Sequence, residues 1–111
     1  MDRAKPIVIH DTENKRDYTL EFSRDAVRFA EGRGFIIDDL DKFPMMKTPE
    51  FFWYAFRTHH PSVSLNQADK ILEQIGGMTP EIAKRLGELW ADTFRSLNDE
   101  ERKNPNMTVE L

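Results

Sequence analysis

The 111-residue chain contains no cysteine, so disulfides, thiolate metal sites and cysteine nucleophiles are all excluded. No basic N-terminal segment leads into an apolar run, and no apolar stretch approaches the roughly 20 residues that span a bilayer. Positive charge is also scarce, because 16 lysines and arginines against 20 aspartates and glutamates give a formal net charge of −4. Non-specific nucleic-acid binding needs an excess of cations to displace phosphate counterions. We therefore expect a soluble, intracellular protein with neither a membrane nor a nucleic acid as its partner.

What is present suits one small globular domain, with 39% hydrophobic and 32% charged residues. The apolar pattern places this domain at residues 1–97, with a β-hairpin in 1–22 and helices in 23–97. Residues 98–111 are polar and predict a flexible C-terminal tail, within which Met107–Val109 is a candidate docking segment.

The hairpin is predicted from two short runs separated by polar turn residues. Ile7–Ile9 is β-branched, and Tyr18, Leu20 and Phe22 alternate with polar residues, as in a strand with one buried face. Two strands alone are only marginally stable. The hairpin must therefore lie on helices or pair with strands of another subunit, which makes Tyr18 and Leu20 candidate interaction residues.

Helix start and stop signals divide the rest of the domain. A capping residue precedes three predicted helices, at Ser23, Ser64 and Thr79, and Ser64 has a capping-box glutamine three residues later. Glycines that can adopt positive φ end two of these helices, at Gly32–Gly34 and at Gly76–Gly77.

A further predicted helix is the most unusual segment. It begins at Thr48–Glu50, ends before Pro61, and carries five aromatics among the six residues from Phe51 to Phe56. Because successive helical residues are rotated by about 100°, these rings cannot share one face. Either other parts of the chain cover the helix on nearly every side, or part of its surface is reserved for a partner chain.

The predicted fold is therefore α+β and mainly α, with an N-terminal β-hairpin followed by about four helices packed around the aromatic helix. The sequence leaves open how far this helix is shared between chains. Its candidate core-plus-interface residues are Phe52, Trp53, Tyr54 and Phe56, with Trp90 and Phe94 expected to pack behind them.

No residue pattern predicts catalysis, a cofactor site or a metal site. His59–His60 are adjacent and point about 100° apart, so they suit one metal ion poorly, and we expect them to bond the last carbonyls of the aromatic helix. Asp38–Asp41 lacks the alternating ligands and glycine of a calcium loop and predicts a solvated acidic turn. We expect a protein that is not an enzyme, with a metal-dependent enzyme built on His59 and His60 as one alternative.

In its order of parts the chain resembles the tail assembly chaperones of siphovirus-type bacteriophages. The resemblance covers Tyr18 to Leu97 and follows YTLEF, then EGRGFIIDDL, then FFWYAFRTHHPSVSLNQADKILEQIGG, and a final helix opening with Glu81–Leu86. The segments most like the family are Phe52–Pro61 and the helix that begins at Ser64.

The resemblance implies a small, mostly helical, non-catalytic protein without cofactors. Such proteins bind the tape measure protein, recruit tail tube subunits, and often self-associate into homo-oligomers. They are phage or prophage encoded, act in the cytoplasm of the bacterial host, and are not expected in the mature virion; many are also made as a longer, frameshifted product. The alternative is a small phage or prophage adaptor or regulatory domain that binds one folded partner.

Overall fold

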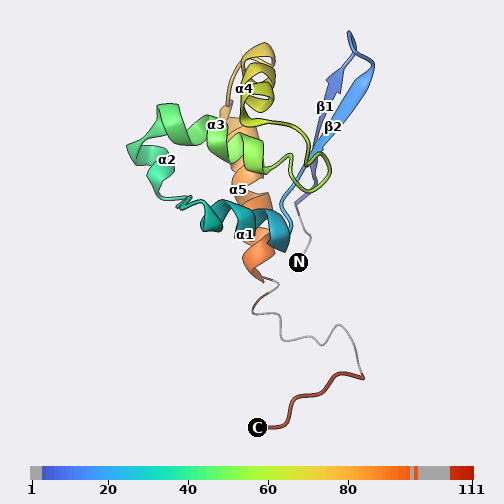
Figure 1. Ribbon diagram of the computed structural model, residues 1–111, viewed down its shortest axis with the longest axis vertical. Helices are drawn as coiled ribbons and strands as arrows, with labels where there is room; N and C mark the ends of the chain where they lie inside the picture. The colour runs from blue at the N-terminus through green and yellow to red at the C-terminus, as the bar shows by residue number, and fades with distance from the viewer. Residues whose placement is uncertain (1–3, 96, 98–105) are drawn as a thin grey trace.

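The computed structural model describes residues 4–95, 97 and 106–111, and over these residues the predicted fold class is confirmed. The chain forms a β-hairpin followed by helices, and the fold is α+β and mainly α (Figure 1). In chain order the elements are β1 (Ile7–Asp11), β2 (Arg16–Leu20), α1 (Arg24–Gly32), α2 (Asp39–Lys42), α3 (Pro44–Tyr54), α4 (Leu65–Gln74) and α5 (Pro80–Arg95). The short α2 is the one helix in the described residues that was not expected.

The two strands pair antiparallel, with a register that runs from Ile7 opposite Leu20 to Asp11 opposite Arg16. Tyr18 and Leu20 are buried on the inner face, as their alternation predicted. The hairpin lies against the helices of its own chain, which supply the apolar surface that two strands need.

The predicted caps are confirmed at three helix starts. The side-chain oxygens of Ser23 and Thr79 each accept a hydrogen bond from the backbone N–H three residues later. Ser64 and Gln67 form a complete capping box, with bonds of 3.2 Å and 2.8 Å between side chain and backbone in both directions. Gly76 has a φ of 94°, so a residue without a Cβ is required where the chain leaves α4.

The acidic segment Asp38–Asp41 is solvated at Asp38 and Asp41, as expected, but its conformation was not predicted. Asp39–Lys42 forms a one-turn helix, closed by the Phe43 N–H donating to the Asp39 carbonyl over 2.8 Å. The acidic residues favour this outcome, because Asp39 and Asp41 lie in the first turn of α2, where a carboxylate interacts favourably with the helix dipole.

Both predicted ends of the aromatic helix are also wrong. The helix begins at Pro44, whose missing N–H costs nothing in a first turn, so Pro49 falls inside it instead of at its start. Pro49 has no N–H to donate to the carbonyl of Met45, so the regular hydrogen bond between these two residues is missing from α3. At the other end α3 stops at Tyr54, because the Ala55 carbonyl accepts a 3.1 Å hydrogen bond from Glu21 N–H and the next residues continue in tighter turns.

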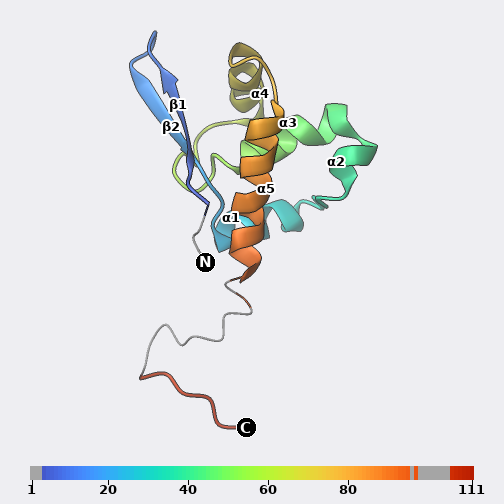
Figure 2. The ribbon, with the colours of Figure 1, turned by 180° about the vertical axis from the view of Figure 1, so that it is seen from behind.

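One apolar core joins the hairpin to the helices. Seen from behind, α5 runs through the middle of the domain, between the hairpin and the α2–α3 corner (Figure 2). Around it, four rings from different segments contact one another with centroids 5.2 to 5.7 Å apart: Phe22, Phe35, Phe51 and Trp90. Trp90 thus contacts α3 through Phe51, and Phe94 lies beside Trp90 at 5.8 Å. These edge-on and stacked contacts fix the position of α3 against α5.

Candidate protein-interaction surface

The aromatic helix is covered by its own chain. Phe52, Tyr54 and Phe56 have no exposed surface, and neither has Leu20, while Tyr18 is 8% exposed. Tyr18 packs its ring edge-on against Phe56 at 5.6 Å, so β2 supplies part of the cover. In this conformation these five candidate residues build the core, and an interface role for them would require the domain to open.

Trp53 differs from the other α3 candidates because it is only half-buried. Its indole N–H donates to the Val63 carbonyl over 2.8 Å, and its ring meets Phe29 edge-on at 5.7 Å. The Arg33 guanidinium lies 5.2 Å from the ring centroid, a cation–π contact. Trp53 therefore keeps some exposed surface but is held by α1 and by the loop before α4.

Tyr54 is a hydrogen-bond donor inside the core. Its hydroxyl donates to a Glu50 carboxylate oxygen at 2.5 Å, and the other oxygen of Glu50 lies 3.4 Å from Lys47 Nζ. Burial, together with the neighbouring Glu50 carboxylate, raises the pKa of Tyr54 to about 12. The phenol therefore stays protonated at neutral pH and can keep donating its hydrogen bond to Glu50, which suits a structural role.

The expectation that His59 and His60 bond the last carbonyls of the aromatic helix is wrong. His60 Nε2 accepts a hydrogen bond of 3.0 Å from the Thr19 N–H in β2, and His59 pairs with the Glu21 carboxylate. Burial lowers the pKa of His60, with smaller contributions from His59 and Arg16, so the ring is kept neutral as an acceptor must be. Both histidines tie the segment after α3 to β2, and the described residues contain no group of three or more histidine, aspartate or glutamate side chains placed to bind a metal ion.

Four large apolar side chains in the segment from Ile36 to Met46, which includes α2 and the first turn of α3, are left in water. We call them the α2–α3 patch, and their exposed fractions are 57% for Ile36, 55% for Phe43, 88% for Met45 and 70% for Met46. Figure 1 shows α2 and the start of α3 projecting from the side of the domain opposite the hairpin. Neighbouring exposed apolar residues of this kind are typical of a protein-binding surface.

Sequence reasoning missed this patch, because the aromatic helix was expected to begin at Thr48–Glu50, after Phe43–Met46. Since α3 begins at Pro44, Met45 and Met46 instead occupy its first turn, before the helix reaches the core. Two adjacent methionines next to a phenylalanine were the available signal, since methionine is common on surfaces that bind varied partners. They follow no helical or strand period, so no pattern argument selected them.

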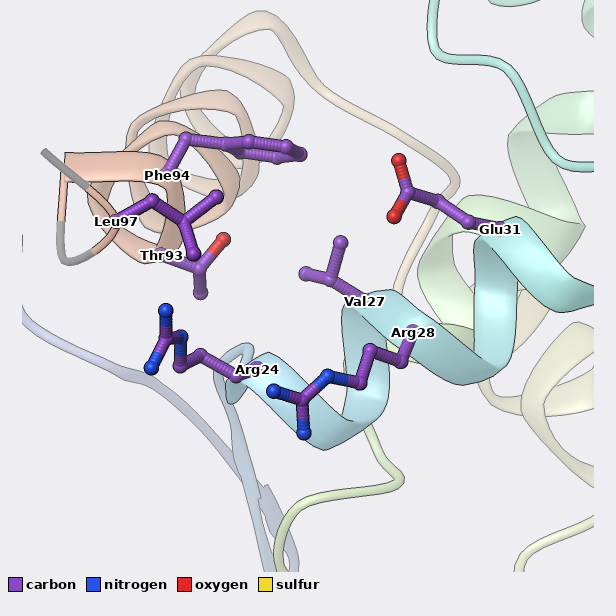
Figure 3. Close-up of a pocket in the computed structure, with 7 residues that line it drawn as sticks. All are labelled: Arg24, Val27, Arg28, Glu31, Thr93, Phe94 and Leu97. Atoms are coloured by element: carbon purple, nitrogen blue, oxygen red, sulfur yellow. The ribbon is translucent and has the colours of Figure 1, made fainter.

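A shallow groove separates α1 from the end of α5. Val27 points across it toward Phe94 and Leu97, Arg24 and Arg28 extend at one end, and Glu31 stands at the other (Figure 3). Its residues include no histidine, and they offer no general base beside a nucleophile. The groove is a junction between two packed helices with charged ends.

Within the described residues, no helix combines the length and apolar character that crossing a bilayer requires. Comparison of the chain with curated proteins and with solved structures finds no match. A protein-family model matches residues 3–111, nearly the whole chain. The protein therefore belongs to the family described as Domain of unknown function (DUF5055).

Proposed function

We propose that this protein is a non-enzymatic phage tail assembly chaperone that binds the tape measure protein, and also tail tube subunits, during tail morphogenesis. It acts in the cytoplasm of the bacterial host, self-associates, and is not retained in the mature virion. Two things support this proposal: the resemblance of Tyr18 to Leu97 to that class of protein, and the α2–α3 patch. The patch is the observation that carries it, because it leaves large apolar side chains in water beside a core that is already closed.

The chemistry of the patch suits an apolar, variable client. Met45 and Met46 have unbranched side chains that adapt to different surfaces, and Phe43 supplies a larger anchor. Burying each of the four side chains would contribute roughly 1.5–3 kcal/mol, or about 6–12 kcal/mol together. Association itself costs an estimated 4–15 kcal/mol, so a single chain binds weakly and reversibly.

Weak single contacts explain why self-association matters to this proposal. Several linked copies, each presenting one patch to a long client, would bind far more tightly than one copy. Release then requires only that the copies separate. A transient assembly factor needs both tight binding during assembly and easy release afterwards.

A second candidate function is a small phage or prophage adaptor that binds one folded partner. The closed core favours it, because Phe52, Tyr54 and Phe56 have no exposed surface without any partner chain. A monomer at every concentration in light scattering behind a sizing column would favour the adaptor, whereas concentration-dependent larger species would favour the chaperone.

The direct test is co-expression with the tape measure protein of the same phage. Wild-type chain should keep the tape measure protein soluble and co-purify with it, and the double substitution Met45→Asp with Met46→Asp should abolish both effects. Met45→Leu with Met46→Leu is the matched control, because it changes the same two exposed positions but keeps an apolar side chain of similar size at each. The proposal is refuted if the patch variant, still folded, protects the client as well as the control does.

A further inference from the structure

The rest of the chain forms hydrogen bonds with one edge of the hairpin and leaves the other edge unpaired. The outer edge of β2 is closed by the segment after α3: Thr19 N–H donates to His60 Nε2 at 3.0 Å, and Glu21 N–H donates to the Ala55 carbonyl at 3.1 Å. The Glu21 carbonyl accepts from the Thr58 hydroxyl at 3.2 Å. No further strand can pair with β2 along Thr19 to Glu21.

The register shows which groups β1 presents at its own free edge. Thr19 points its N–H away from β1, so the opposite residue, Val8, belongs to a pair without mutual hydrogen bonds and points its own N–H and carbonyl away from β2. Because the pattern alternates along the strand, His10 also points its N–H and carbonyl away from β2. No group in the described part of the chain bonds the backbone of Val8 or His10 from that side, and the Val8 side chain is 48% exposed. An unpaired edge of this kind is a template for an added strand.

The chain carries a segment suited to that edge. In Met107–Leu111 apolar residues alternate with Thr108 and Glu110, which is the period of a strand with one buried face. All three apolar side chains are in water, at 68% for Met107, 85% for Val109 and 115% for Leu111. The segment lies far from the body of the domain (Figure 1).

The groove beside β1 is lined mostly by polar residues of the hairpin turn, but it also contains an apolar strip that such a strand could cover. Between the upper hairpin and α4 it is lined by Ile9, Ile71 and Ile75, each only half-buried. A strand added to β1 with Met107, Val109 and Leu111 on the side of Ile9 would cover this surface. Thr108 and Glu110 would then lie on the opposite, wet face, beside Val8 and His10.

We propose that the free edge of β1 binds Met107–Leu111 of a second copy of the chain as an added β-strand. The segment belongs to a second copy because in its own chain it extends away from the hairpin and leaves the β1 edge unpaired (Figure 1). Chain length does not exclude pairing within one chain. Ala4 N–H donates to an Asp92 carboxylate oxygen at 2.9 Å, which places the start of the hairpin beside the end of α5, and the ten residue steps from Leu97 to Met107 can span up to about 35 Å. The test must therefore separate the two arrangements.

The absence of native cysteine makes engineered cross-linking the sharpest test. Chains carrying Val8→Cys are mixed with chains carrying Thr108→Cys or Glu110→Cys and oxidised, and the expected product is a disulfide-linked pair of the two different chains. Val109→Cys is the control, because its side chain would lie on the opposite face, and it should link at least about tenfold less. A single chain carrying both Val8→Cys and Thr108→Cys reveals pairing within one molecule.

Each outcome decides the proposal. Links between unlike chains at residues 108 or 110 support it, whereas a linked monomer from the double variant shows that the segment folds back on its own chain and overturns it. Links only between two Val8→Cys chains show that β1 edges pair with each other, which also overturns it. If residues 108 and 110 link to Val8→Cys no more than the Val109→Cys control does, the proposal is also overturned.

A second measurement ties the strand to self-association. The double substitution Val109→Pro with Glu110→Pro removes an N–H that points toward β1 whichever direction the added strand runs, so it should lower the self-association constant at least about tenfold in analytical ultracentrifugation. This inference deepens the self-association part of the proposed function and rests on that part alone. Met45→Asp with Met46→Asp should lose the client and keep self-association, so that failure of the strand and failure of the chaperone role give different results.

Discussion

Replacing His60 with phenylalanine should destabilise the domain by removing one acceptor while keeping a ring of similar size. The ring contacts with Tyr18, at 5.3 Å, and with Phe56, at 6.4 Å, can be kept by phenylalanine. The Thr19 N–H, which donates to His60 Nε2 at 3.0 Å, loses its partner. Because Thr19 is half-buried and can be partly hydrated, the cost should be about 1–2 kcal/mol, toward the lower end for an unsatisfied donor.

The same bond predicts a pH dependence with a definite sign. His60 accepts only when neutral, and its pKa in the folded protein lies below the ordinary value of 6.5, mainly because of burial. As pH falls through about 6.5 the unfolded chain takes up the proton first, so the wild-type free energy of unfolding decreases until the folded ring is protonated as well. His60→Phe lacks this contribution, and the difference between the two proteins should therefore be largest near pH 8 and shrink toward pH 5.

Urea unfolding of both proteins at a series of pH values measures that difference directly. His59→Phe is the matched control, because the contact between His59 and Glu21 is more exposed: the His59 side chain is 41% exposed and the Glu21 side chain 31%, so the contact is worth at most about 1 kcal/mol. At pH 8 the melting temperature of His60→Phe should fall by about 4–8 °C. Equal stability of His60→Phe and wild type at pH 8, or a difference between them that does not change with pH, would refute the role given to this acceptor.

Three further predictions concern the helices. Ser64→Ala should lower the free energy of unfolding by about 1 kcal/mol by breaking the capping box, while Ser62→Ala, in the exposed turn before it, should change nothing measurable by chemical denaturation. Phe52→Ala should cost about 3–5 kcal/mol because the side chain is completely buried, and near-wild-type stability would mean that the core of α3 packs differently. Trp53→Glu should abolish folding, which circular dichroism detects, or self-association, which light scattering detects. A variant that keeps both would show that Trp53 is no anchor. Trp53→Phe serves as the conservative control.

Local signals in the sequence predicted much of this fold because they act within a few residues. The alternation around Tyr18 and Leu20, the capping box at Ser64 and the glycines after α4 each depend on the chain nearby. All three appear in the structure where expected. The fold class followed from them, since hairpin and helix signals occupy separate parts of the chain.

The errors arose where a distant segment decides. Pro49 was a reasonable first residue for a helix, but nothing in the sequence showed that Pro44 serves that purpose five residues earlier. The end of α3 depends on Glu21 bonding the Ala55 carbonyl, and the positions of both histidines depend on β2. Such tertiary contacts have no signature in local composition.

The exposed apolar surface was the hardest part to predict, for a related reason. The aromatic residues of α3 were predicted to serve both the core and an interface. Their number says only that they need cover, and in the single chain the core provides that cover. Exposed residues such as Met45 and Met46 could be recognised only once the start of α3 was known. Burial is a property of the assembled domain, whereas hydrophobicity is a property of the residue.

Pro49 gives α3 two mechanically unequal halves. Residues after it are packed among the rings of the core, whereas the turn before it carries Met45 and Met46 and is tied to the rest of the helix by one hydrogen bond fewer. The first turn can therefore tilt or fray at small cost while the aromatic half stays fixed. Amide exchange should be fast from Met45 to Thr48 and slow from Phe52 to Tyr54. In the proposed complex, the first turn of α3 could therefore adjust to clients of different shape while the packed core of the domain stays unchanged.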